Sequence, residues 1–109
     1  MVSITIDTNS AQEYTAFHCI GHSGYAESGE DIVCAAVSVL VINTINSIEH
    51  LVSDAFELSS NQETGQIDFS LSDGYSKESL LLIQSMALGL QGIQQNYGTE
   101  YLKLTFKEV

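Results

Sequence analysis

The sequence predicts an α+β fold, a two-layer sandwich in which two helices cover one face of a mainly antiparallel sheet. Short segments of alternating apolar and polar residues flank two long segments of helical periodicity, in the order β-β-α-β-β-α-β. The joins between neighbouring strands are short and turn-like, which favours antiparallel hairpins. No linker, repeat or low-complexity segment divides the 109 residues, so residues 1–109 are expected to form one domain.

The first two elements are predicted to be strands. In residues 2–7, VSITID, apolar and polar side chains alternate as in a half-buried strand. A polar turn leads to residues 14–20, which we expect to form a second, antiparallel strand. Because successive side chains on a strand point to opposite faces, Cys19 is expected in the core and His18 on the other side.

A long helix is predicted from Ile32 to about Ala55, because apolar residues recur there with a period near 3.6. The many β-branched residues make a strand the competing interpretation, but strands rarely exceed about ten residues. Asp31 stands where an N-cap is expected, which would put Cys34 in the first turn, near the third helical position.

The second half of the chain predicts a hairpin and a second helix. Alternating apolar residues on both sides of a turn that contains Gly65 predict the hairpin over residues 56–71. Ser76 is expected to cap a helix that runs to about Tyr97 and ends at Gly98.

Two glycines inside this second helix cost roughly 1 kcal/mol each relative to alanine. We therefore expect another backbone, of the sheet or of a second subunit, to come close to Gly89 and Gly92. Residues 102–106 alternate again and predict the last strand.

The most informative segment is residues 21–38, GHSGYAESGEDIVCAAVS, in which a loop of small residues separates His22 from Cys34. A cysteine in the first turn of a helix lies near the positive end of the helix dipole, which favours the thiolate. A histidine that the loop brings close would complete a Cys–His pair for acyl transfer. The residues alone therefore indicate a thiol hydrolase with Cys34 as the nucleophile and His22 as the general base and proton donor. The loop residues expected to admit the substrate are Gly21, Ser23, Gly24, Tyr25 and Gly29.

The same residues can also be explained by structural roles alone. Cysteine is commonly a small buried hydrophobe, and the carboxylates of Glu30 and Asp31 would disfavour a thiolate at Cys34. Asp31 either caps the helix or orients His22 as a third catalytic group. Ser38 follows Cys34 by four residues and shares its helical face, where it either supports the site or fills space. Backbone N–H groups at the helix start, including that of Cys34, are the expected oxyanion donors.

No metal or cofactor is expected. His18, Cys19 and His22 form an HCxxH string, but on a strand Cys19 points away from both histidines, so the three cannot ligate one ion. Cys19 and Cys34 are expected to be free thiols, and His50 is expected to be a surface residue.

The net charge of the protein limits the kinds of partner that it can bind. Three lysines, no arginine and a formal net charge of −11 exclude direct nucleic-acid binding, because such a surface repels phosphates. The same surface would attract a basic partner, or it serves only to keep the protein in solution. The N-terminus lacks the features of a signal peptide and no uninterrupted apolar run has membrane-spanning length, so we expect a cytoplasmic protein without membrane association.

The stretches GHSGYA and GEDIVCAAVS resemble the signature of the ribosomal-processing cysteine protease (Prp) family, and the resemblance extends over nearly the whole chain. It implies a bacterial cytoplasmic endopeptidase, typically a homodimer. It also implies the substrate, a basic protein of the large ribosomal subunit, the twenty-seventh in large-subunit nomenclature, whose N-terminal extension is removed. The family's catalytic histidine and cysteine fall on His22 and Cys34. The rival interpretations are a non-catalytic acidic module that binds a basic ribosomal protein and a thiol-dependent hydrolase of a small acyl substrate.

Overall fold

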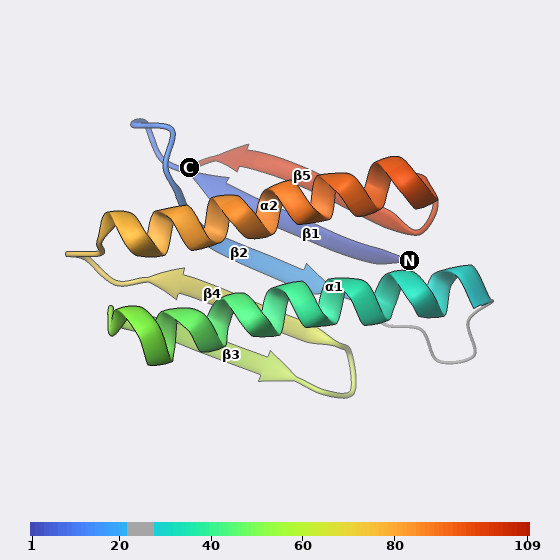
Figure 1. Cartoon of the computed structure of the whole chain (residues 1–109), viewed down its shortest axis with the longest axis horizontal. Helices are drawn as coiled ribbons and strands as arrows, with labels where there is room; N and C mark the ends of the chain where they lie inside the picture. The colour runs from blue at the N-terminus through green and yellow to red at the C-terminus, as the bar shows by residue number, and fades with distance from the viewer. Residues whose placement is uncertain (22–27) are drawn as a thin grey trace.

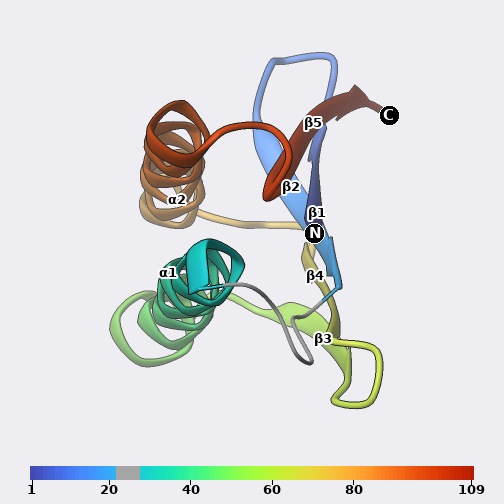
Figure 2. The ribbon, with the colours of Figure 1, turned by 90° about the vertical axis from the view of Figure 1, so that its right-hand side faces the viewer.

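The structure has two layers, a mixed sheet and a pair of long helices that lie side by side on one of its faces (Figures 1 and 2). It is a computed structural model that describes residues 1–21 and 28–109, and for residues 28–31 the backbone only. The predicted α+β sandwich and its element order are confirmed. Within the described residues the elements are β1 (Val2–Thr8), β2 (Tyr14–Ile20), α1 (Ser28–Ser47), a π-helical turn η1 (Ile48–Val52), β3 (Phe56–Asn61), β4 (Gln66–Leu71), α2 (Lys77–Tyr97) and β5 (Leu102–Glu108).

The strand order β3-β4-β2-β1-β5 explains why both helices cover the same face. The pairs β1–β2, β2–β4 and β3–β4 are antiparallel, and β5 runs parallel to β1. Each helix therefore connects two strands that point the same way: α1 joins β2 to β3, and α2 joins β4 to β5. The two connections begin at strands that run in opposite directions, β2 and β4, and they lead toward opposite edges of the sheet. Since connections between parallel strands are right-handed, this arrangement places both helices on the same face.

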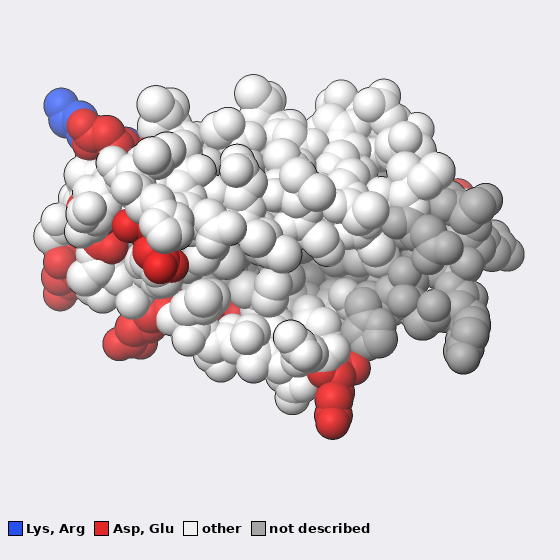
Figure 3. Space-filling model, turned by 60° about the horizontal axis from the view of Figure 1, so that its bottom comes forward, with Lys and Arg blue, Asp and Glu red and all other residues white. Residues whose placement is uncertain are grey.

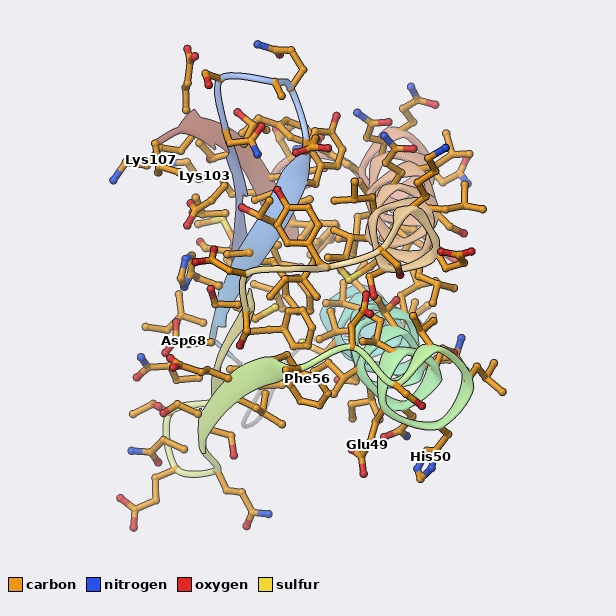
Figure 4. The ribbon with its side chains drawn as sticks, turned by 90° about the vertical axis from the view of Figure 1, so that its left-hand side faces the viewer. Glu49, His50, Phe56, Asp68, Lys103 and Lys107 are labelled. Carbon is orange, nitrogen blue, oxygen red and sulfur yellow. The ribbon has the colours of Figure 1, made fainter. Side chains whose placement is uncertain are left out.

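The core lies between the sheet and the helices. Phe17 of β2 and Phe69 of β4 are fully buried and stack with ring centroids 4.8 Å apart. Phe56 of β3 points toward the helices in Figure 4, with its centroid 5.0 Å from that of Phe69. Each fully buried ring stabilises the fold by roughly 1.5–3 kcal/mol relative to an exposed one. From the helices, the core receives Val33, Val37, Val41, Ile45, Ile48, Ile83, Met86, Ala87 and Leu90.

The first helix differs from its predicted bounds at both ends. It begins at Ser28, four residues before the predicted start, and gives way at Ser47 to the π-helical turn. The N–H of Ser53 donates to the carbonyl of Ile48, and Ser53 has φ of 69°, a left-handed conformation that ends the helix before the predicted Ala55. The small polar residues before Ile32, which suggested a loop and a cap, form the first helical turn instead.

By length and composition, the segment Ile32–Val52 could cross a membrane. In this structure one side of it is buried in the core, at positions spaced by three or four residues. Such spacing is typical of an amphipathic core helix.

The second helix begins as predicted. Ser76 is its N-cap, with the Ser76 Oγ accepting from the backbone N–H of Ser79 at 3.4 Å. The carboxylate of Asp54, just after η1, accepts from both serine hydroxyls at 2.7 and 2.6 Å, and these bonds hold the pKa of Asp54 below its usual value. The link ties the start of α2 to the end of the preceding helical segment.

The two glycines inside α2 have different surroundings. A Cβ on Gly89 would lie 2.9 Å from a methyl carbon of Leu40, so the close neighbour is a side chain of α1 rather than the predicted backbone. A Cβ on Gly92 would meet no atom of the described residues within 4 Å. The prediction of close backbone packing within the chain is therefore wrong at both positions, and the contact at Gly89 lets the two helices approach.

Candidate active site

Cys34 lies on α1, at the end of the helix that faces the Gly21 end of β2. Because α1 begins at Ser28, Cys34 is in the second turn, not in the predicted first turn. Asp31 is the fourth residue of the helix, so its predicted role as N-cap is wrong, and Gly29 is helical rather than part of the loop. The alternative role of Asp31, orienting His22, concerns a side chain outside the described ones.

The new position of Cys34 changes the electrostatic argument. The predicted effect of the helix dipole assumed a cysteine in the first turn, where the dipole mainly acts. The N–H of a residue in the second turn also lies in the hydrogen-bonded part of a helix, which removes Cys34 N–H as an expected oxyanion donor.

A small cavity surrounds Cys34. Its volume is about 60 Å³, room for a few atoms, and the half-buried sulfur-bearing side chain forms part of its wall. Ser38 lines the same cavity one turn along the helix, which confirms the predicted shared face. The lining comes from α1, from the first two strands and from the hairpin: Val2, Cys19, Gly21, Cys34, Val37, Ser38, Val41, Gly65 and Ile67.

Gly21 connects this cavity to the predicted catalytic loop. Its φ of 100° is a conformation that side chains rarely adopt, and a Cβ there would lie 2.5 Å from the carbonyl oxygen of Met1. Its N–H donates to the carbonyl of Thr64 at 3.3 Å. Gly21 lines the Cys34 cavity, and His22 follows it directly in the chain. The chain therefore enters the predicted catalytic loop at the edge of this cavity. The predicted residues His22, Ser23, Gly24 and Tyr25 themselves lie outside the described residues.

Cys19 forms the opposite wall of the cavity and has the properties of a core thiol. It is buried, as predicted, and burial together with the nearby charge of Asp68 raises the pKa of Cys19 to about 12. A thiol with this pKa is almost entirely protonated at neutral pH and is a poor nucleophile. Both cysteines are free, so two thiols of different accessibility line one cavity.

A second, larger cavity opens beside the first and was not predicted from the sequence. It has a volume of about 400 Å³ and runs as a groove between α1 and the β3–β4 hairpin. Four residues, Gly21, Ser38, Gly65 and Ile67, line both cavities, so the groove is continuous with the Cys34 cavity. In Figure 3, which brings this side forward, the carboxylates lie toward the margins and the middle of the surface is uncharged. The apolar Ile42 and Leu58, which line it, each leave about half of the residue exposed, and no local pattern in the sequence shows this exposure.

The other two histidines lie away from this site, as predicted. His18 faces the side of the sheet opposite the helices, the side on which Figure 4 shows Asp68, Lys103 and Lys107. Its Nδ1 lies 2.8 Å from an Asp68 carboxylate oxygen and its Nε2 lies 2.8 Å from one of Asp7. His50 is exposed near the end of the first helical segment, next to Glu49.

The contacts of His18 make fold stability pH-dependent. Burial lowers the pKa of His18, but hydrogen bonds and charges of Asp7 and Asp68 outweigh burial and raise it above 6.5. Both ring nitrogens can donate to carboxylates only in the protonated ring, so deprotonation breaks one bond. The stabilisation is therefore complete below about pH 6.5 and is lost as the pH rises through the folded-state pKa.

We expect His18→Gln to lower the melting temperature most near pH 6, with a difference from the wild type that shrinks toward about pH 9. Thermal unfolding of both proteins across this range checks the prediction. A difference that stays constant with pH would contradict a protonated His18.

The comparisons with known proteins agree with a protease site. The family model described as Cysteine protease Prp matches residues 1–103. The chain is 29% identical over 107 residues to the ribosomal processing cysteine protease Prp of Staphylococcus aureus, covering 98% of this chain and 100% of that protein.

Two crystal structures of Prp from S. aureus are also similar to this structure. The structure in complex with a substrate peptide has a TM-score of 0.90 at 28% identity, and the one with a covalently linked product peptide has 0.87 at 29%. Each covers 98% of this chain and 100% of that chain. A match over nearly all residues, with the same fold, shows that this chain belongs to the cysteine protease Prp family.

Proposed function

We propose that this protein is an endopeptidase that removes the N-terminal extension of a large-subunit ribosomal protein, the twenty-seventh of that subunit, during ribosome maturation. The observation that carries the proposal is the half-buried Cys34, which lines a small cavity continuous with a groove large enough for a peptide segment. The relatives from S. aureus support the substrate class, because they are named ribosomal processing proteases and one is bound to a substrate peptide.

The proposed mechanism uses a Cys34–His22 dyad. His22 takes the proton of the Cys34 thiol, and the thiolate attacks the carbonyl carbon of the scissile peptide bond. His22 then protonates the leaving amine, which leaves the N-terminal extension bound to Cys34 as a thioester. Water, activated by His22, hydrolyses the thioester and restores the thiol. A product peptide covalently linked to the S. aureus relative is consistent with such a covalent step.

The acidic surface supports a basic substrate. With a net charge of −11 and carboxylates toward the margins of the face shown in Figure 3, the protein attracts a chain rich in lysine and arginine. Direct binding of nucleic acid is disfavoured by the same charge. The proposed location is the cytoplasm, which fractionation of cells would test.

The outer face of the helical layer supports a homodimer. Ile32 and Val39 of α1 and Leu81 and Leu88 of α2 each expose half of their surface or more. The segment of the first helix from Ile32 to Ile48 contains no charged residue. Two copies with a charge of −11 repel one another, so they would associate through an uncharged surface of this kind. Sedimentation in solution tests the association.

The function is tested by incubating the protein with the extended ribosomal protein and determining the N-terminus of the product by mass spectrometry. We expect a single cut that releases the extension, since a continuous groove beside one nucleophile fixes the register of the peptide. A substrate with glutamine in place of the lysines and arginines after the cut is the control for basicity and should be cut more slowly at low salt. Tight binding without any cut would contradict the proposal and favour a non-catalytic acidic module.

A further inference from the structure

We propose that Cys19 and Cys34 form a reversible disulfide across their shared cavity, and that this bond switches the protease off when a peroxide oxidises Cys34. The proposal deepens the proposed function and rests on it, because Cys34 is taken as the nucleophile. It gives Cys19 a role that the cleavage reaction does not use. Cys19 becomes the resolving thiol, the thiol that converts an oxidised cysteine into a disulfide.

The two thiols border the same small space from opposite layers of the fold. Cys34 belongs to α1 and Cys19 to β2, and both line the cavity of about 60 Å³. Both cysteines are free, and the cavity has room for only a few atoms. A disulfide brings its two Cβ atoms to about 3.8 Å, so the bond would close the space between helix and strand at this point. The scissile carbonyl of a substrate would then have no access to the Cys34 sulfur.

The exposure of the two thiols sets the order in which they are oxidised. Cys34 is half-buried in a cavity that is continuous with the open groove, whereas Cys19 is only 6% exposed. Burial also raises the pKa of Cys19 to about 12, so Cys19 stays protonated at neutral pH and reacts poorly with peroxide. Peroxide therefore reacts first with Cys34, whose proton His22 removes in the proposed mechanism.

The disulfide forms in two steps, with hydrogen peroxide as the oxidant. The Cys34 thiolate attacks one peroxide oxygen, the O–O bond breaks, and Cys34 becomes a sulfenic acid while hydroxide leaves. In this step the sulfur gives two electrons to the peroxide. The Cys19 sulfur then attacks the Cys34 sulfur, the S–O bond breaks, and the departing hydroxide takes the Cys19 proton to form water.

The surroundings of Cys34 favour this route over further oxidation. Among the described residues that line the cavity, Cys19 is the only other thiol, so a sulfenic acid at Cys34 has one thiol partner within the site. A disulfide is reduced back to two thiols by a dithiol, whereas a second oxidation of Cys34 to sulfinic acid is not reversed by thiols. Disulfides of cytosolic proteins are usually transient and redox-sensing, which fits a bond that forms only under oxidant.

The test treats wild-type protein and Cys19→Ala with hydrogen peroxide and then with dithiothreitol. In wild-type protein we expect a product lighter by two hydrogen atoms, with Cys19 and Cys34 joined in one linked peptide after digestion. Cleavage activity should disappear as this product forms and return with the reductant. In Cys19→Ala, Cys34 should instead gain two oxygen atoms, and about fivefold less activity should return, because sulfinic acid resists thiols.

Val37→Ala is the matched control. Val37 lines the same cavity and is 4% exposed, so its replacement also removes buried atoms but leaves both thiols in place. We expect Val37→Ala to form the disulfide and to recover its own starting activity as fully as wild-type protein does. If wild-type protein forms no disulfide between Cys19 and Cys34, or if Cys19→Ala recovers as fully as wild-type protein, the inference is overturned.

The mass measurement separates this inference from the proposed function, because it needs no substrate. If wild-type protein cuts no substrate but the disulfide forms under peroxide and is reversed by dithiothreitol, the proposed function fails while the reactive thiol pair stands. If cleavage occurs and peroxide yields only sulfinic acid at Cys34, the switch fails while the protease function stands.

Discussion

Replacing Cys34 with alanine is expected to lower kcat by at least about 10⁴-fold, because the nucleophile of a covalent mechanism is lost. The fold should be retained, since Cys34 is only half-buried and alanine is a better helix former. Cleavage of the extended ribosomal protein and thermal unfolding of the same sample measure the two effects.

Cys19→Ala is the control for this prediction, because Cys19 lines the same cavity. This variant should retain most of the activity and lose stability, by about 1 kcal/mol, since a buried side chain becomes smaller. A thiol alkylator should likewise modify Cys34 quickly and Cys19 slowly near neutral pH, because burial holds Cys19 protonated. An inactive Cys19→Ala together with an active Cys34→Ala would reverse the assignment.

Replacing His22 with alanine is expected to lower kcat by about 10²- to 10⁴-fold. The loss is large because the Cys34 thiol then has no general base to take its proton. Residual cleavage should rise with pH as the thiolate forms without a base. Initial rates from about pH 6 to about pH 9 measure both effects.

His18→Ala and His50→Ala are the controls for the loss at His22. His18 is on the far side of the sheet and His50 is exposed near the end of the first helical segment, so both variants should cut at nearly the wild-type rate. His22→Ala with wild-type rates at neutral pH would remove His22 from the mechanism.

Local periodicity predicted most of the fold. The alternation in residues 2–7 and the turn signal before residues 14–20 identified both strands. Because successive side chains of a strand point to opposite faces, the second strand also placed Cys19 in the core and His18 on the other side. The cap at Ser76 was also predictable, since its side chain acts within one turn.

Features set by long-range contacts were not predictable. The parallel pairing of β1 with β5 joins residues at opposite ends of the chain, and no local pattern records it. The start of α1 was misplaced because Gly29, Glu30 and Asp31 are typical of loops and caps, and a helix that packs on a sheet can include such residues.

The site was predictable in its chemistry but not in its shape. A cysteine and a histidine near a loop of small residues suggested the reaction class from residue type alone. The groove, in contrast, is formed by α1 and the β3–β4 hairpin together, and only the fold brings Ile42 and Leu58 to the same cavity.

The parallel pairing of the first and last strands has a consequence for synthesis of the chain. Val2, which lines the Cys34 cavity, lies opposite Leu102, and its N–H donates to the carbonyl of Tyr101. While the chain is being synthesised, β1 therefore has no second neighbouring strand until the residues of β5 have left the ribosome. Until then β1 is an open edge with a row of unpaired backbone groups, the kind of surface on which incomplete chains aggregate. A nascent chain that stalls before β5 is thus left with one wall of the cavity unsupported and with an edge that a second nascent chain can join.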